Sequence, residues 1–393
     1  MTWVDSFRQK AKESFPNFFS FNSKIRTRII AEPTIDSLIA STFLIKTLQH
    51  FAFNFSFSFQ KKITEATINE IEKDSSELII LLYQNLPQNL IEKTTKKIIL
   101  FNQQQFNQEK TIPISSLIYF FCKEYYHEIS NLSYLLPIPY IHNNSEPNES
   151  IIQESLVSKK LEIKKGLTIL SSQTLPLHKS VANTIYPYLP GISGSEDEAV
   201  NLLIENNLPL RENSRFRNLT DLNEEETKML LTSILLKRLG SEKNPEMVMG
   251  NTYIIALEDE NSFIKDLKCF SLLLESCLAF SKYSLAVLIC MNPSNKFKAI
   301  EYVNNTLTGV VSAMTYYLDN KKSIVTETDK ITIISLNHNL DYKLIDIFSK
   351  IIFNSNVYPE KIIAVISMNP ASQIICNLES SKNLQPFLEN LSK

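Results

Sequence analysis

The chain has 393 residues, of which 44% are hydrophobic, and its 40 Lys and Arg residues nearly balance its 42 Asp and Glu residues. This length exceeds what one compact core usually holds and predicts two or three domains. The balanced charge excludes a global basic field that would attract nucleic acid, and the sequence contains neither of the glycine-rich patterns GxGxxG and GxxxxGK[ST] of phosphate-binding loops.

The five cysteines are scattered without any CxxC pair: Cys122, Cys269, Cys277, Cys290 and Cys376. Such spacing favours reduced core cysteines in an intracellular protein over a zinc site or a disulfide framework. No apolar run reaches the ~18 residues that a membrane span needs, and no signal peptide opens the chain. We therefore expect a cytoplasmic protein without membrane contact.

The first segment in chain order is residues 3–15, where apolar side chains at helical spacing are interleaved with Arg8, Lys10 and Lys12. This pattern predicts a basic amphipathic helix. A docking helix with a solvated face is favoured over a helix that binds membranes or DNA.

Short apolar runs then alternate with helical patterns. The runs predict strands at 29–31, 51–63, 77–85 and 98–101, and the segments between or after them predict helices at 37–49, 86–93 and 115–126. This alternation predicts βαβ units and a parallel sheet. The five alternating phenylalanines from Phe51 to Phe59 fit a packed sheet better than a base-stacking surface, because no Lys or Arg lies among them.

Polar side chains lie at the ends of several predicted strands, where open α/β sheets keep their sites. Thr34 and Asp36 follow the first strand, Tyr83 lies near the end of the third, and Asn102-Gln103-Gln104 follow the fourth. Asp36 has two interpretations: it caps the helix that it precedes, or it belongs to an acidic metal cluster. The local pattern alone favours capping.

In order and spacing, these positions resemble the four motifs of the DHH phosphoesterase superfamily, to which the RecJ nucleases belong. The first motif reads His-x-Asp-x-Asp-Gly-x-x-Ser-Ala and resembles Glu32-Pro-Thr-Ile-Asp-Ser-Leu-Ile-Ala-Ser41. The aspartate of the second motif matches Tyr83, and the Asp-His-His signature matches Asn102, Gln103 and Gln104. The fourth aspartate matches Asn143, which follows the apolar run 132–142. Of the ligand positions, only Asp36 keeps the family's residue, while Glu32 replaces a histidine.

The chemistry of the superfamily needs two divalent ions to make hydroxide and to stabilise the transferring phosphoryl group. Two dications about 4 Å apart repel by roughly 17 kcal/mol at an effective dielectric constant of about 20. One or two acidic groups and three amides do not neutralise that charge. The resemblance therefore implies a degenerate site without metal, cofactor or catalysis at the positions Glu32, Thr34, Asp36, Tyr83, Asn102, Gln103, Gln104 and Asn143.

The rest of the chain predicts a helical connector and a second α/β domain. Pro187–Ser195 resembles the Pro-rich turn between domains in archaeal RecJ-like proteins, and Ser195 and Asn223 each begin a helix with an acidic residue three positions later. Gly240 is expected to end the second of these helices.

The last part resembles the DHH-associated domain, but it lacks the serine-arginine element and the GGGH segment of the RecJ enzymes. Its pattern predicts strands at 249–257, 285–290, 331–336 and 362–367 and helices at 263–281 and 298–318.

These features predict an α/β protein in three parts. Residues 1–150 form a degenerate DHH domain with a parallel sheet flanked by helices, 151–245 a helical inter-domain connector, and 246–393 a smaller, degenerate DHH-associated α/β domain. The chain is identified as a member of the archaeal, inactive Cdc45-like proteins, which are RecJ-derived.

Membership in this family implies a non-catalytic, chromosome-associated replication subunit whose partners are the GINS complex and the MCM helicase of the CMG assembly. Two alternatives stay open. One is a residual metal-dependent single-strand DNA exonuclease or phosphodiesterase that uses Glu32 and Asp36. The other is a single-stranded DNA-binding module that uses the basic N-terminal helix and the old substrate groove.

Overall fold

The computed structural model describes residues 25–83, 94–101, 112–170, 175–240, 242, 244–355, 357–368 and, by backbone alone, 374–379. The predicted helices at 3–15 and 86–93 lie outside the described residues. The chain folds into two compact units: unit 1 is Met1–Glu162, Tyr253–Glu258 and Phe270–Ile300, and unit 2 is Ile163–Thr252, Asp259–Cys269 and Glu301–Lys393. The three-part domain division stays a prediction.

Unit 1 contains a four-stranded sheet in the order β2-β1-β3-β4, in which all neighbouring strands run parallel. Its strands are β1 (Thr27–Ala31), β2 (Phe55–Phe59), β3 (Leu78–Leu82) and β4 (Lys97–Phe101). Its helices are α2 (Ile35–His50), α3 (Glu65–Lys73), α5 (Ile114–Lys123), η3 (His127–Leu135), α6 (Ile138–His142), α7 (Glu149–Val157), α12 (Tyr283–Met291) and η7 (Pro293–Ala299). The predicted α/β class with a helix-flanked parallel sheet is confirmed.

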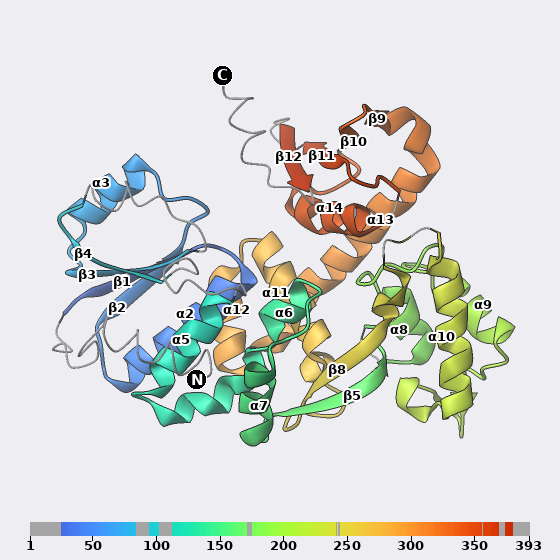
Figure 1. The fold of residues 1–393 in the computed structure, drawn as a ribbon, viewed down its shortest axis with the longest axis horizontal. Coiled ribbons are helices and arrows are strands. Elements are labelled where there is room, and N and C mark those ends of the chain that lie inside the picture. The colour runs from blue at the N-terminus through green and yellow to red at the C-terminus, as the bar shows by residue number, and fades with distance from the viewer. Residues whose placement is uncertain are drawn as a thin grey trace. The chain divides into compact units, whose positions relative to one another are not determined.

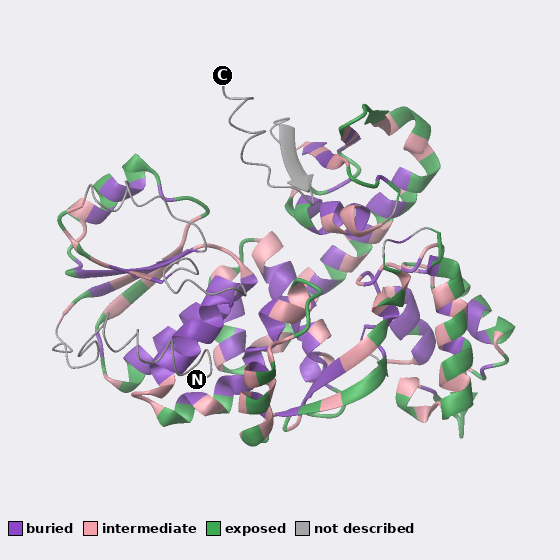
Figure 2. Cartoon of the chain, viewed as in Figure 1, coloured by how far each residue is buried: buried purple, intermediate pink, exposed green. Residues whose placement is uncertain are grey.

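The sheet lies between α3 on one face and α2 on the other (Figure 1). Ile30, Ile79 and Leu81 pack with the apolar residues of α3. Helix α2 is buried along almost its whole length (Figure 2), because α5 and α12 pack against it in addition to the sheet. A helix at such a central position is expected to be buried on all sides.

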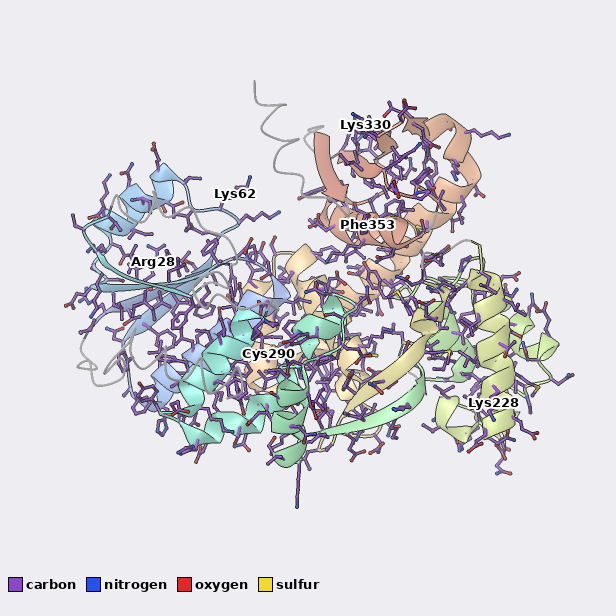
Figure 3. The ribbon with its side chains drawn as sticks, in the orientation of Figure 1. Arg28, Lys62, Lys228, Cys290, Lys330 and Phe353 are labelled. Atoms are coloured by element: carbon purple, nitrogen blue, oxygen red, sulfur yellow. The ribbon has the colours of Figure 1, made fainter. Side chains whose placement is uncertain are left out.

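Two predicted strands of this unit are corrected. The run 285–290 is part of α12, a helix whose Ala286, Val287, Ile289 and Cys290 are buried, and Cys290 is labelled in Figure 3. A short apolar run fits a buried strand and a buried helix equally well, so periodicity alone does not separate them. The second strand is shorter than predicted: β2 occupies only Phe55–Phe59 of the predicted 51–63.

Unit 2 contains a helical part and a mixed sheet. The helical part comprises α8 (Leu177–Asn183), α9 (Glu196–Glu205), α10 (Glu224–Arg238), the hairpin strands β6 (Arg211–Glu212) and β7 (Arg215–Phe216), and the short helices η4 (Leu219–Asp221) and η5 (Pro245–Val248). Leu203 of α9 and Leu230 and Ile234 of α10 belong to its core.

The mixed sheet has the order β12-β11-β10-β9, with a parallel β10–β11 pair between two antiparallel pairs. Its elements are β9 (Val325–Glu327), β10 (Ile331–Asn337), β11 (Ile362–Met368), β12 (Ile374–Glu379), α13 (Ile300–Ile324), η8 (Tyr342–Leu344) and α14 (Ile345–Asn354). Tyr317 of α13 and Phe348 of α14 meet edge to face, with ring centroids 6.2 Å apart. The predicted strands at 331–336 and 362–367 are confirmed.

The remaining elements are η6 (Phe263–Lys265), α11 (Leu267–Ala279) and the strands β5 (Leu161–Leu167) and β8 (Met249–Ile255), which pair in a two-stranded sheet. None of the described helices is both long and apolar enough to cross a membrane. Among the described cysteines, Cys122, Cys269, Cys277 and Cys290 are buried and form no disulfide.

The predicted helix boundaries of the connector agree with the structure. Ser195 is the N-cap of α9 and its hydroxyl accepts a hydrogen bond from the Glu198 N–H. Asn223 and Glu226 form a full capping box at the start of α10. Gly240, with φ +83°, follows the end of that helix and takes the left-handed conformation that glycine adopts without a steric penalty.

We expect Gly194→Ala to lower the free energy of unfolding more than Gly191→Ala. Both glycines have positive φ, +88° and +72°, so each substitution costs about 1 kcal/mol in backbone strain. A Cβ at Gly194 would lie 1.9 Å from Cγ1 of Val311 on α13, whereas one at Gly191 meets nothing within 4 Å. The overpacking adds about 1–3 kcal/mol at Gly194 only.

Chemical denaturation of both variants measures this difference, and adding Val311→Ala to Gly194→Ala should recover part of the loss. Equal losses at the two glycines would show that Val311 moves aside freely.

Candidate functional site

The carboxyl edge of the parallel sheet brings two of the predicted positions together. Glu32 follows β1 and its N–H donates to the Leu82 carbonyl of β3 at 3.0 Å, while the Gln60 N–H, after β2, donates to the Ala31 carbonyl at 2.9 Å. The ladder therefore continues one residue beyond the strands. As a result Glu32, Gln60 and Tyr83 lie at adjacent strand ends.

Tyr83 places an aromatic ring at the end of β3, next to Glu32 and Gln60. The residue is 2% exposed and packs with the α3 side of the sheet, and its hydroxyl donates to the Gln60 carbonyl at 2.7 Å. Burial, and secondly the negative charge of Glu32, raise the pKa of the Tyr83 phenol far above its ordinary value. The side chain is thus a neutral phenol whose proton is already donated to the backbone, and it does not supply the charge of a carboxylate ligand.

Thr34, not Asp36, caps helix α2. The Thr34 hydroxyl accepts the Ser37 N–H at 3.2 Å, and the helix begins at Ile35. The expectation that Asp36 caps the helix it precedes is therefore wrong. Asp36 already lies in the first turn of α2, and its side chain points toward another element.

Both carboxylate oxygens of Asp36 accept backbone N–H groups from the first turn of α5. Oδ2 accepts from Ile114 and Oδ1 accepts from Ser115, each at 2.8 Å. Helix α5 has no side-chain cap of its own at Pro113, so the carboxylate satisfies donors that a helix start leaves unpaired. Its negative charge also lies at the positive end of the helix dipole. With 6% exposure, Asp36 is a buried connection between α2 and α5.

Asn143 does not follow a strand. The predicted run 132–142 forms the end of η3 and helix α6, and Asn143 is the exposed C-cap of α6. Helix α6 packs against α2. Burial raises the pKa of the Tyr140 phenol on α6 to about 12; a hydrogen bond with Ser116 opposes this rise and the negative charge of Asp36 adds to it. Among the described contacts, none joins the Asn143 side chain to Glu32, Asp36 or Tyr83.

The third motif, Asn102, Gln103 and Gln104, lies outside the described residues, so its part in the site stays a prediction. β4 ends one residue earlier at Phe101 and pairs with β3. Within the part of the chain that the structure describes, no group of three or more His, Cys, Asp and Glu side chains is placed to hold a metal ion.

The described residues therefore do not fit a pair of divalent ions. The Asp36 oxygens are bonded to backbone donors, the Thr34 hydroxyl caps a helix, and Tyr83 is a neutral phenol. Carboxylates must balance the charge of two adjacent dications. The described residues supply too little of that charge to hold such a pair.

Gln60 and Ser37 also belong to this edge, and sequence reasoning missed both. The Gln60 amide oxygen is buried without a hydrogen-bond partner, and the Ser37 hydroxyl donates to the Leu82 carbonyl at 3.3 Å. Lys61 and Lys62 follow Gln60 and are exposed, as Figure 3 shows for Lys62. The signal in the sequence was the polar stretch directly after the alternating phenylalanines.

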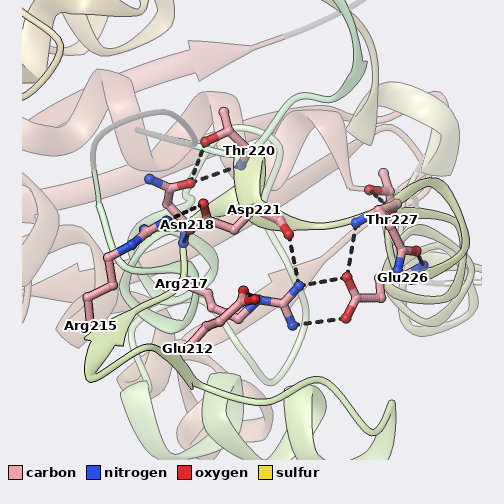
Figure 4. Close-up of polar contacts among 9 residues, drawn as sticks. Glu212, Arg215, Arg217, Asn218, Thr220, Asp221, Glu226 and Thr227 are labelled. Carbon is pink, nitrogen blue, oxygen red and sulfur yellow. Dashed lines mark hydrogen bonds and ion pairs between the residues drawn. The ribbon is translucent and has the colours of Figure 1, made fainter.

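A second polar cluster orders the segment 211–227 of unit 2 (Figure 4). Arg217, whose side chain is 6% exposed, donates to both oxygens of Glu226 at 2.9 and 2.6 Å and to the Asp221 carbonyl at 2.9 Å. Arg215 donates to both oxygens of Asp221 at 2.8 and 2.7 Å. These bidentate pairs are the stronger kind of ion pair, and they tie the β6–β7 hairpin to the first turn of α10.

Comparisons with known proteins agree with this architecture. The DHH-CID domain family matches residues 169–249. The structure of CDC45 from Entamoeba histolytica is similar with a TM-score of 0.64 and 9% identity, over 99% of this chain and 91% of that chain. No curated protein sequence matches the chain.

Two RecJ structures are also similar. Exonuclease RecJ bound to manganese gives a TM-score of 0.49 and 7% identity over 93% of this chain and 80% of that chain. RecJ in complex with Mn2+ from Thermus thermophilus gives 0.48 and 7% over 93% of this chain and 46% of that chain. At such TM-scores these two likenesses carry no further conclusion. The likeness to CDC45 establishes the fold: a DHH-type α/β fold of the Cdc45 kind.

We expect Asp36→Asn to lower the free energy of unfolding by about 1–3 kcal/mol, because an amide offers one acceptor where two buried N–H groups need two. Urea denaturation measures the loss, and Glu70→Gln, on the exposed side of α3, is the matched control that should change little.

The same loss should appear in manganese and in EDTA. If manganese stabilised the native protein and not the Asp36→Asn variant, Asp36 would be a metal ligand after all.

We expect Glu226→Gln to be less stable than the native chain at pH 7 by about 1 kcal/mol, with the difference closing in acid. The hydrogen bond from Arg217 holds the pKa of Glu226 below its ordinary value of 4.5. A lowered native pKa stabilises the fold above the ordinary value, and that contribution is lost as pH falls through the lowered pKa.

Thermal unfolding between pH 3 and pH 8 tests this. Glu225→Gln, at the exposed neighbouring position of the same turn, should track the native curve. A Glu226→Gln deficit that persists unchanged at pH 3 would refute the ionic origin.

Proposed function

We propose that this chain, which has the DHH-type fold of CDC45 and contains a DHH-CID domain, is a non-catalytic subunit of the DNA-replication machinery. It binds the GINS complex and supports the MCM helicase, as a cytoplasmic, chromosome-associated protein. The fold and the domain match support a replication-related protein of this kind.

The observation that carries the proposal is the bonding of Asp36. It is the one motif position that keeps the acidic residue of the nuclease superfamily, and both of its oxygens accept backbone N–H groups of α5. A carboxylate in this arrangement stabilises the fold. To coordinate an ion it would have to leave two buried N–H donors unpaired, at a cost of about 1–3 kcal/mol each.

Tyr83 supports the same conclusion from the neighbouring strand. In the resemblance its position is that of an aspartate, yet the structure holds a buried ring there with its hydroxyl bonded to the backbone. The sheet edge keeps its shape while its charge is reduced, which fits a protein selected for assembly. The likeness to CDC45 covers 99% of this chain, which supports the retention of the whole architecture.

We expect GINS and MCM subunits to co-purify with the native protein in near-stoichiometric amounts. Affinity purification from the native cell, followed by quantitative mass spectrometry, measures the ratio. A reconstituted mixture of purified chain, GINS and MCM, analysed by size exclusion, separates direct from indirect binding. The absence of both partners from both experiments would remove the proposed function.

A second candidate, binding of single-stranded DNA at the sheet edge, is favoured by the exposed Lys61 and Lys62 beside the buried Gln60 amide. Fluorescence anisotropy with a labelled single strand, at several salt concentrations, tests it in the native chain and in Lys61→Glu/Lys62→Glu. The same strands with manganese test for residual nuclease activity. Cleavage that disappears in Asp36→Ala would overturn the non-catalytic assignment.

A further inference from the structure

Unit 2 buries a pair of oppositely charged side chains at the end of α10. Arg238, the last residue of that helix, is 1% exposed, and Glu242 is 6% exposed. Charged side chains are rarely buried this far without a strong partner. The ion pair between these two is long, however, because the Arg238 Nη2 and the Glu242 Oε2 lie 3.8 Å apart.

The guanidinium of Arg238 is held by backbone carbonyls. Its Nε donates to the Pro245 carbonyl at 3.1 Å, its Nη1 to the Tyr188 carbonyl at 2.7 Å, and its Nη2 to the Asn244 carbonyl at 2.9 Å. These bonds hold Asn244 and Pro245 against the end of α10. They do not involve Glu242, so they are available in either charge state of that carboxyl group.

Glu242 is the weakly bound member of the pair. Its backbone N–H donates to the Arg238 carbonyl at 3.1 Å, but among the described residues no hydrogen bond reaches its carboxyl oxygens. A buried carboxylate without hydrogen bonds loses solvation and gains little in return. Burial therefore raises the pKa of the Glu242 carboxyl to about 7, and the charge of Arg238 opposes this rise without cancelling it.

Glu242 also joins two parts of unit 2. An isolated antiparallel β-bridge pairs it with Ser355, which is the C-cap of α14. The Ser355 N–H donates to the Ile351 carbonyl of α14 at 3.1 Å, so the bridge connects the segment after α10 to the end of a well-formed helix. A second contact between the same parts is independent of Glu242, since the Tyr186 hydroxyl donates to the Ile347 carbonyl at 2.9 Å.

The other titratable groups belong to the elements around the pair: Tyr188 before α9, Glu246 in η5, Asp266 and Lys268 at the start of α11, and Asp346 and Lys350 in α14.

These groups leave Arg238 as the charge that acts on the Glu242 carboxyl. Burial and the Glu242 charge raise the pKa of the Tyr188 phenol to about 12, so it is neutral near pH 7. Glu246 is exposed and acts on Arg238. Asp266 accepts the Lys268 N–H at 2.8 Å.

The remaining charges are engaged or lie further along the chain. The Lys268 ammonium donates to the Thr168 carbonyl at 2.8 Å. Asp346 and Lys350 both precede Ser355 by more than one helical turn. Lys243, next to Glu242 in the sequence, lies outside the described residues.

We propose that Glu242 is a pH-sensitive contact between the helical part of unit 2 and the end of α14. As a neutral acid it stays buried beside Arg238 and keeps the bridge to Ser355. Once ionised, it gains solvation by moving toward water, which opens the bridge while Arg238 stays bonded to its three carbonyls. This property does not depend on the proposed function.

The raised pKa of Glu242 fixes the sign of the effect. Between the ordinary value of 4.5 and about 7, the folded chain binds more protons at this group than the unfolded chain does. The stability that Glu242 contributes is therefore fully present below 4.5 and is lost as the pH rises through about 7.

Glu242→Gln tests the proposal, because glutamine resembles the neutral acid and does not ionise. In urea denaturation of the full chain, the unfolding equilibrium constant of the native protein should rise by about tenfold or more between pH 5 and pH 8 relative to that of the variant. Glu246→Gln, which removes the exposed carboxylate near Arg238, is the matched control and should follow the native curve.

Two other groups titrate in this range, since burial raises the pKa of the Asp266 carboxyl to about 6 and lowers that of the Lys268 ammonium to about 8. The native chain and both variants share these groups, so the comparison isolates Glu242. Parallel curves would overturn the proposal. A glutamine variant that loses stability relative to the native chain as the pH rises would also overturn it, because ionised Glu242 would then be the required counter-charge of Arg238.

Hydrogen exchange measured by mass spectrometry locates the opening. After correction for the intrinsic rates, peptides that cover Glu242 and Ser355 should exchange several-fold faster at pH 8 than at pH 6 in the native chain, and at equal rates in Glu242→Gln. Peptides of α9 should show no such change in either chain.

An exchange effect that is the same in both chains, or that spreads over the whole protein, would contradict the opening. If the glutamine variant does not fold, the native chain decides the matter alone, by whether the peptides at Glu242 and Ser355 change with pH while those of α9 do not. Neither measurement involves GINS or MCM, so the proposal and the proposed function can fail separately.

Discussion

The hydrogen bonds from the start of α5 to Asp36 hold together the part of the molecule on which the candidate site depends. They join residues 78 and 79 positions apart in the sequence and connect the central helix α2 to a helix that begins without a side-chain cap. The Asp36 carboxylate accepts two buried backbone N–H groups, and its negative charge lies at the positive end of the α5 dipole. Removing any one of them leaves a charged or polar group buried without its partner.

That arrangement also restricts what the sheet edge is able to do. In a two-metal site the carboxylates face the ions, and their charge compensates the repulsion between them. Here the retained carboxylate faces backbone donors, and the adjacent strand end holds the Tyr83 ring with its hydroxyl on the Gln60 carbonyl. The strand ends remain in register because the ladder continues through Glu32 and Gln60. The contacts that hold this edge of the sheet in shape therefore need no metal.

Ion pairs also order a short segment in each of the two units. The Arg215, Arg217, Asp221 and Glu226 pairs fix the hairpin of unit 2 to α10, and the Glu258–Lys296 pair fixes the turn after β8 to η7 in unit 1. In both places ion pairs order a short segment that exposes apolar groups, Phe216 in the hairpin at 40% and Leu257 in the turn at 77%. Fixed geometry lowers the entropy that any binding at such a segment must overcome.

By itself, the sequence determined the local features. Alternating strand and helix patterns predicted the parallel sheet and the strands at 331–336 and 362–367, and capping residues predicted the starts of α9 and α10 at Ser195 and Asn223. These features were predictable because propensity, periodicity and capping act within a few residues. The order of the degraded motifs also pointed to the DHH-type fold, which the likeness to CDC45 confirms.

Only the tertiary structure decided which distant segments of the chain contact one another. The direction of Asp36 toward α5, the helical state of 285–290 against α2, the helix end at Asn143 and the presence of Gln60 at the sheet edge all depend on contacts between distant segments. A short apolar run or a single carboxylate carries no information about which distant partner it meets. The local sequence therefore predicted helices and strands of this protein, and tertiary packing decided which polar groups meet at the carboxyl edge of the parallel sheet.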